Sequence, residues 1–244
     1  MFKNLNMIKK ILNKVRSFDI ALHTNIPNQL KQQKSLELLL KMFEPGFYFP
    51  VTPWTMNSTE IRHICNEIVA NQRRNIVEFG SGFSTVCIAQ LLKSNHLKAE
   101  FISIDNNPDW ILFLKEILKN LNLENYVKFI SAPIEKVPSE YGWKEQKTWF
   151  STEILDNEFN SINRVDLIVI DGPEGSSSPF ARYSAIPFLK NKLNHSYSVF
   201  LDDANRMDET EITNQWKSLL NCNSMNCDKY IYFYENAKFG TLPF

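Results

Sequence analysis

Short apolar runs alternate with amphipathic stretches along most of this chain. From residue 75 onward the apolar runs predict buried strands, and the segments between them carry apolar residues at the three-to-four spacing of helices. Strands that alternate with helices form mainly parallel sheets covered on both faces, so the pattern predicts a doubly wound α/β fold. The parallel strands are expected at residues 75–79, 101–105, 127–131, 166–171 and 197–201, and the helices at 84–92, 108–121, 181–193 and 209–220.

The last part of the chain predicts an antiparallel hairpin that closes this sheet. Residues 229–234 and 238–243 read as its two strands, joined by a turn at 235–237. Added to the five parallel strands, they give an expected sheet of seven strands. A polar, tryptophan-containing stretch at 139–163 lies between the third and fourth parallel strands and predicts no regular element.

The N-terminal part differs from the rest in both pattern and charge. Residues 1–48 predict two helical stretches separated near residues 25–28, and they contain eight lysines and arginines against three acidic residues. A basic face of this kind could bind an anionic membrane surface or an acidic protein, although a solvated face on an accessory helical layer is the simpler interpretation. Prolines at 45–53 break the pattern, so we expect a helical extension at 1–48 and the sheet domain at 49–244.

Composition narrows the classes of function. The 27 basic residues equal the 27 acidic ones, so no overall field attracts nucleic acid, and none is expected as a partner. No apolar stretch approaches the roughly 18 residues that cross a bilayer, and the start of the chain lacks the apolar core of a signal peptide. The four cysteines show no metal-ligand spacing. We therefore expect reduced thiols and a cytoplasmic protein of unknown oligomeric state.

The loop after the first strand carries the strongest functional signal. Only seven glycines occur in the chain, and four of them, Gly80, Gly82, Gly172 and Gly175, fall in two short loops. A Gly-x-Gly turn between a buried strand and a helix lets a ligand lie against the main chain, close to the amides of the helix N-terminus. Gly80-Ser81-Gly82 therefore predicts the entrance of a binding site for a nucleotide-type ligand.

Acidic residues recur where the predicted parallel strands end. Asp105 lies 105 − 82 = 23 residues after Gly82, near the interval of about 20 at which an acid accepts hydrogen bonds from ribose. Asp171 follows the fourth strand, and Asp202 and Asp203 follow the fifth. Thr85 stands where a dinucleotide fingerprint would have Gly or Ala, which disfavours NAD and FAD, and no phosphate-binding P-loop motif is present.

With these motifs the sequence resembles the class I S-adenosylmethionine-dependent methyltransferases, whose fold is Rossmann-like, and in particular their O-methyltransferase-like branch. The matching segments are Val77 to Gly82, Ile104-Asp105, Val169 to Pro173 and Phe200 to Asp203, and the likeness spans about residues 55–244. The resemblance implies a cofactor site for S-adenosylmethionine, with Glu78 near its amino group, directly or through water, Asp105 on its ribose and Asp171 facing the methyl group. The implied cofactor-binding residues are Glu78, Phe79, Gly80, Ser81, Gly82, Ser84, Asp105 and Asp171.

The resemblance also implies methyl transfer to a hydroxyl of a small molecule, such as a sugar or glycan precursor, with Asp171 and Asp202 as catalytic residues. Two ways of activating that hydroxyl stay open. Asp171, Asp202 and Asp203 could hold Mg²⁺, or one of these carboxylates could act as a general base without metal. Arg182 and Arg206 could clamp an anionic substrate group or simply pair with neighbouring acids. Other functions left open are a nucleotide-dependent oxidoreductase and a non-enzymatic binding module on the same fold.

Overall fold

A seven-stranded sheet forms the centre of the computed structural model, which describes residues 26–160, 162 and 164–243. The strand order is β3-β2-β1-β6-β7-β9-β8, in which the first five strands are parallel and the last two antiparallel to their neighbours. The expected α/β fold with an antiparallel hairpin at one edge is confirmed. The strands are β1 Asn75–Phe79, β2 Glu100–Asp105, β3 Lys128–Ser131, β6 Val165–Ile170, β7 Leu193–Leu201, β8 Asn223–Asn226 and β9 Ile231–Glu235, and a separate two-stranded sheet joins β4 Ile134–Lys136 to β5 Thr148–Phe150.

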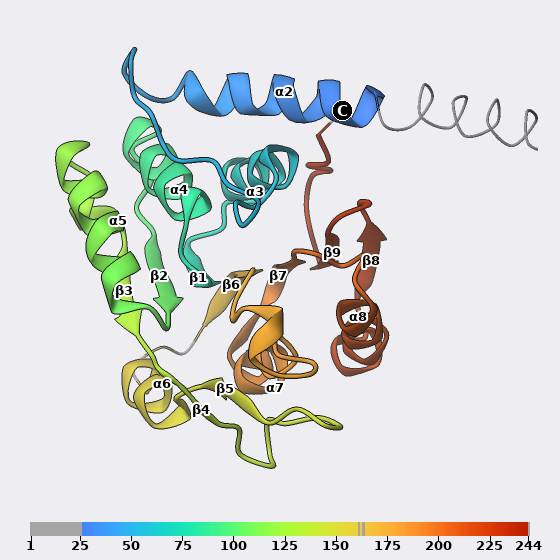
Figure 1. Cartoon of the computed structure of the whole chain (residues 1–244). Helices are drawn as coiled ribbons and strands as arrows, with labels where there is room; N and C mark the ends of the chain where they lie inside the picture. The colour runs from blue at the N-terminus through green and yellow to red at the C-terminus, as the bar shows by residue number, and fades with distance from the viewer. Residues whose placement is uncertain (1–25, 161, 163, 244) are drawn as a thin grey trace, which may run out of the picture.

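Helices cover both faces of the main sheet (Figure 1). One apolar cluster joins one face to α3, α4 and α5, and a second joins the other face to α6, α7 and α8. β6 is buried at every position, which explains why the strands read as unbroken apolar runs. The α-helices are α2 Ile26–Leu40, α3 Ser58–Ala70, α4 Phe83–Ser94, α5 Pro108–Asn120, α6 Thr152–Phe159, α7 Ala185–Leu189 and α8 Met207–Leu220, and short 3₁₀ turns occupy η2 Glu124–Tyr126, η3 Gly175–Ser177 and η4 Lys190–Lys192.

Three of the expected elements differ from the structure. The hairpin pairs β8 with β9, so the expected strand at 238–243 is wrong, and those residues form a tail without regular structure. The helix expected at 181–193 shortens to α7 and η4, and β7 begins at Leu193. The polar stretch at 139–163 contains β5 and α6, because Trp149, Phe150 and Phe159 are buried there.

The helix α2 lies across the top of the molecule beside α3 (Figure 1). Leu39 is buried in the same apolar cluster as α3 and α4, and the Ser35 hydroxyl lies 3.4 Å from the Thr59 hydroxyl. The second helical stretch of the expected extension is therefore a packed layer. The first stretch lies outside the described residues, and it contains five of the eight basic residues of the extension. The domain boundary at 48/49 and the contact with a membrane or protein stay predictions.

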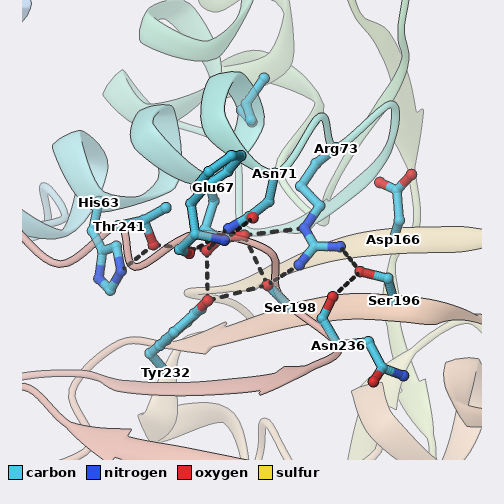
Figure 2. A network of polar contacts seen from close by, with 12 residues as sticks. His63, Glu67, Asn71, Arg73, Asp166, Ser196, Ser198, Tyr232, Asn236 and Thr241 are labelled. Atoms are coloured by element: carbon cyan, nitrogen blue, oxygen red, sulfur yellow. Dashed lines mark hydrogen bonds and ion pairs between the residues drawn. The ribbon is translucent and has the colours of Figure 1, made fainter.

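A buried polar network fastens the C-terminal tail to α3 (Figure 2). Glu67 on α3 is fully buried, and its Oε1 accepts hydrogen bonds from Asn71 Nδ2 (2.8 Å), Tyr232 Oη (2.5 Å) and Thr241 Oγ1 (2.7 Å). Its Oε2 pairs with Arg73 Nε at 3.0 Å. Burial alone would raise the pKa of Glu67, but these donors and the guanidinium lower it. The carboxylate is thus held ionised between a helix, the sheet and the tail.

His63 is a second buried member of the same network. Its Nδ1 lies 3.0 Å from Tyr230 Oη and its Nε2 lies 3.0 Å from Thr241 Oγ1. Burial lowers the pKa of His63 to about 4, so the ring is neutral at physiological pH. His63 therefore has a structural role in this network.

None of the helices in the described part of the chain has the length and apolarity needed to cross a membrane.

Candidate active site

One cavity of about 540 Å³ opens at the carboxyl ends of β1, β2, β6 and β7. This is the edge of a doubly wound sheet at which ligands bind, and the volume lies within the range of small-molecule sites. The loops after these strands form its floor, and the segment between α2 and α3 forms one wall. Its main contributors are Phe49 to Asn57 except Val51, Gly80 to Ser84, Asp105 to Asn107, Trp110, Phe150, Asp171 to Gly175, Arg182, Asp202, Asp203, Arg206 and Lys229.

Gly80 is fixed by close contact between two loops. Its φ is +90°, and a Cβ at this position would lie 2.8 Å from the backbone nitrogen of Gly172. A Cβ on Gly172 would meet Gly80 Cα at the same distance. These two glycines therefore let the loops after β1 and β6 touch main chain to main chain. A Cβ at Gly82 would meet no atom within 4 Å, since this residue faces the open cavity.

Glu78 supports the glycine loop from beneath. It is fully buried, and its carboxylate accepts hydrogen bonds from Ser84 Oγ (2.6 Å), Thr85 Oγ1 (2.6 Å) and Ser103 Oγ (2.7 Å). Burial raises the pKa of Glu78 to about 7, although the three hydroxyls oppose this shift. Thr85 Oγ1 also accepts the amide of Gly82 at 2.8 Å. Thr85, which is unlike the dinucleotide fingerprint, thus links the acid to the turn.

Asp105 bridges the loops after β1 and β2. Its Oδ2 accepts the Ser81 amide at 2.9 Å, and its Oδ1 accepts the Asn107 amide at 2.8 Å. Burial raises the pKa of Asp105, and the amide hydrogen bonds oppose that effect. Trp110 Nε1 donates to Ser81 O at 2.8 Å, so its indole also stands at the cavity wall. A carboxylate oxygen has a second lone pair, so Asp105 retains acceptor capacity toward a ligand hydroxyl.

A buried arginine organises the acids at the ends of β6 and β7. Arg182 Nη2 lies 3.1 Å from Asp171 Oδ1 and 3.2 Å from Asp203 Oδ2, and its Nη1 donates to Asp202 O at 2.9 Å. Its Nε lies 3.9 Å from Glu209 Oε1. Arg182 is only 3% exposed and is paired with these acids. Of the two roles expected for it, the structure therefore favours pairing with neighbouring acids over clamping a substrate. The three aspartates all line the cavity, and the sequence had predicted that they meet.

Asp171 differs from an ordinary surface carboxylate. Burial and the neighbouring charge of Asp202 raise the pKa of Asp171 well above its usual range, while Arg182 acts in the opposite direction. A raised pKa makes the ionised carboxylate a stronger proton acceptor, which suits a general base.

The comparisons with known proteins agree with this geometry. Residues 77–204, just over half of the chain, match a family model described as a methyltransferase domain. The chain belongs to this methyltransferase family. Membership confirms the resemblance to the class I methyltransferases and favours methyl transfer over the oxidoreductase and binding-module alternatives. A comparison with curated proteins gives no match.

Solved structures share the fold of this methyltransferase at low sequence identity. A provisionally assigned caffeoyl-CoA O-methyltransferase from Staphylococcus aureus is 18% identical with a TM-score of 0.52, and the alignment covers 91% of this chain and 98% of that one. An O-methyltransferase from Bacillus cereus in complex with SAH is 12% identical with a TM-score of 0.52, at 89% and 96% coverage. An SAH-bound Podospora anserina methyltransferase is 12% identical with a TM-score of 0.53, at 84% and 87% coverage.

Not every expected site residue of the methyltransferase lines the cavity. Glu78 lies below the loop, and the Phe79 side chain is fully buried against Trp149 and Phe150. The sequence analysis missed the wall formed by residues 49–57, in which the Trp54 side chain is 72% exposed. Its prolines indicated a boundary, and no residue type there indicated a ligand.

Glu60 is a further acid near the site, and it lies in the first turn of α3, where its amide is capped. Its amide does donate to Asn57 Oδ1 at 2.9 Å, but its carboxyl group is fully buried and has no hydrogen-bond donor among the described residues. Burial and the nearby Asp202 and Asp171 raise the pKa of Glu60 well above the usual value. A protonated Glu60 beside Asp202 adds no further negative charge to the methyltransferase site.

We expect Glu60→Gln to become more stable relative to the wild type as pH rises. The folded-state pKa of Glu60 lies above its unfolded value, so its favourable contribution is present at low pH and is lost as pH rises through the folded pKa. Glutamine has no such proton to lose. Melting temperatures of both proteins at pH 5 and pH 9 test this, and a value for the variant minus that for the wild type that stays constant or falls from pH 5 to pH 9 would contradict a buried neutral carboxyl.

Proposed function

We propose that the protein transfers a methyl group from S-adenosylmethionine to a hydroxyl of a small polar molecule. The observation that carries the proposal is the cavity in which the glycine loop and Asp105 stand beside the Asp171–Asp202–Asp203 cluster. A cofactor-binding loop and proton-accepting groups thus face the same space. When bound, S-adenosylmethionine would supply an electrophilic methyl group on a sulfonium ion.

The cofactor end of the cavity is built from main chain as much as from side chains. Gly80 and Gly82 leave the loop open to a ligand, and Asp105 offers carboxylate oxygens for ribose hydroxyls. Glu78 keeps the turn in place through Ser84 and Thr85. In this arrangement Glu78 acts on the ligand through the loop, and a bound water would be needed for it to reach the methionine amino group.

The acceptor end supplies a base and holds it in position. Asp171 would take the proton of the acceptor hydroxyl as the oxygen attacks the methyl carbon, and Asp202 and Arg182 would fix its charge and orientation. Placing the hydroxyl in line with the methyl group can itself contribute roughly 7–11 kcal/mol. Polar and apolar groups line the cavity in similar proportion, and polar side chains beside aromatic ones such as Trp54 and Phe150 suit a sugar or glycan precursor.

Radiolabelled S-adenosylmethionine tests the proposal directly. Incubation with a panel of sugars, phosphorylated sugars and catechols should yield a labelled product with at least one of the polar hydroxyl compounds. Label transferred to none of these but to an amine or a carbon acceptor would overturn the hydroxyl assignment.

The acid cluster fits Arg182 better than a magnesium ion. Asp171, Asp202 and Asp203 offer oxygens within 4.8 Å of one another, as a hard cation requires. However, the guanidinium already lies against both Asp171 and Asp203, where it supplies the positive charge. The proposed reaction therefore uses no metal.

We expect EDTA to leave the methylation rate within about twofold of its untreated value, because Arg182 supplies this positive charge. The rate of label transfer before and after dialysis against EDTA measures this. A loss of activity that added Mg²⁺ restores would contradict this prediction and would indicate that Asp171, Asp202 and Asp203 bind a metal ion.

A further inference from the structure

A second cavity of about 210 Å³ adjoins the first on the side of α2. Asn57 and Lys229 line both cavities, so the two spaces meet at these residues. The second is formed by α2, the start of α3, the turn between β8 and β9, and the C-terminal tail. Its lining residues are Asn28, Lys31, Gln32, Asn57, Thr59, Asn226, Cys227, Asp228, Lys229, Tyr230, Leu242 and Pro243.

The two cavities differ in the sign of their charge. The first is lined by five carboxylates against three cationic side chains, whereas the second is lined by Lys31 and Lys229 against Asp228 alone. The Asp228 carboxylate accepts a hydrogen bond from Asn28 Nδ2 at 3.4 Å. An acceptor that reaches across both cavities would therefore meet acids at its hydroxyl end, Lys229 where the two cavities meet and Lys31 beyond it.

Neither lysine is neutralised by a neighbour. Within the described residues, the ammonium groups of Lys31 and Lys229 make no hydrogen bond, ion pair or aromatic contact. The main chain of Lys229 is nevertheless held in place, since its carbonyl accepts the Ala204 amide at 2.7 Å. That bond ties Lys229 to the segment that directly follows Asp202 and Asp203, so this cation has a fixed attachment beside the site.

We propose that the second cavity binds a phosphate group of the acceptor, with Lys31 and Lys229 as its cationic contacts. This inference rests on the proposed function and narrows its substrate class to phosphorylated hydroxyl compounds. Lysine ammonium groups bind phosphate as point charges, and the two cations line the same small space. The amides of Asn28, Gln32 and Asn57 add neutral donors around the same space.

Pyrophosphate is a suitable probe because it carries the charge without the rest of an acceptor. Calorimetric titration should show saturable binding to the wild type, with affinity at least fivefold weaker in each of Lys31→Met and Lys229→Met. Lys34→Met, which removes the same charge from the same helix but lines neither cavity, should stay within twofold of the wild type. Both tested lysines are exposed, so folding should be unaffected.

Three further results would decide against the inference. No saturable pyrophosphate binding, or binding that Lys31→Met and Lys229→Met leave unchanged, would overturn the site. Malonate binding as tightly as pyrophosphate with the same lysine dependence would overturn the phosphate assignment. A parallel titration with S-adenosylhomocysteine separates the two proposals: if this compound fails to bind, the proposed function fails, whereas normal binding of it without pyrophosphate binding removes only the second site.

Discussion

Asp171→Asn is expected to lower the turnover number by about two to four orders of magnitude, which is the usual contribution of a general base. The asparagine keeps the size of the side chain and one oxygen near Arg182, but it cannot accept the acceptor's proton. Affinity for S-adenosylhomocysteine should change by less than about threefold, because other loops hold the cofactor end of the cavity. Steady-state methylation kinetics, together with calorimetry of the same protein, measure both effects.

The pH profile provides an independent check on the wild type. The pKa of Asp171 is raised by burial and by Asp202, so activity should fall on the acid side at a pH above the ordinary aspartate range. Asp109→Asn, in the exposed first turn of α5, is the matched control and should keep full turnover. Full activity of Asp171→Asn would remove this residue from the mechanism.

Glu67→Ala is expected to destabilise the fold by about 3–5 kcal/mol, the range for breaking a buried ion pair by removing one partner. The change leaves the guanidinium of Arg73, which is only 1% exposed, without its carboxylate. It also removes the acceptor for Tyr232 and Thr241, so the C-terminal tail loses one of its attachments to α3 and keeps the contact of Thr241 with His63. Urea unfolding followed by circular dichroism measures the loss.

Glu158→Ala gives the matched comparison. Glu158 pairs with Lys128 at 2.6 Å on the surface, where the two side chains are 38% and 59% exposed, and such pairs contribute about 0–1 kcal/mol. An equal loss of stability in the two variants would show that the Glu67 network does not hold the tail. Because the pKa of Glu67 is lowered, its contribution should persist at neutral pH and be lost only as pH falls through that folded-state pKa.

The strand ends could be predicted from the sequence because buried parallel strands follow simple rules. Apolar runs of five or six residues marked β1, β2 and β6. Because the carboxyl ends of parallel strands lie at the same edge of a sheet, the acids and glycines directly after these strands had to meet there. This is why the sequence predicted Asp105 and Asp171 at the edge of the sheet where the cavity opens. The contact between Gly80 and Gly172 follows from the same geometry.

Other features depend on tertiary contacts that local pattern does not encode. The β8 strand is an exposed, polar edge strand without alternation, whereas the tail at 238–243 carries apolar residues that imitate a strand. The tail instead packs through Thr241 onto His63 and Glu67 of α3. Glu60 lies in the first turn of α3, and only the fold brings its carboxyl group next to Asp202.

Calorimetric titration of the wild type and Asp105→Ala with S-adenosylhomocysteine and with NAD tests the central claim most directly. The wild type should bind S-adenosylhomocysteine at one site per chain and show no binding of NAD. Asp105→Ala should weaken S-adenosylhomocysteine binding by about 1.5–3 kcal/mol, since hydrogen bonds to a charged group are lost. Saturable binding of NAD without binding of S-adenosylhomocysteine, or an affinity that Asp105→Ala leaves unchanged, would contradict the assignment of this cavity as a methyl-donor site.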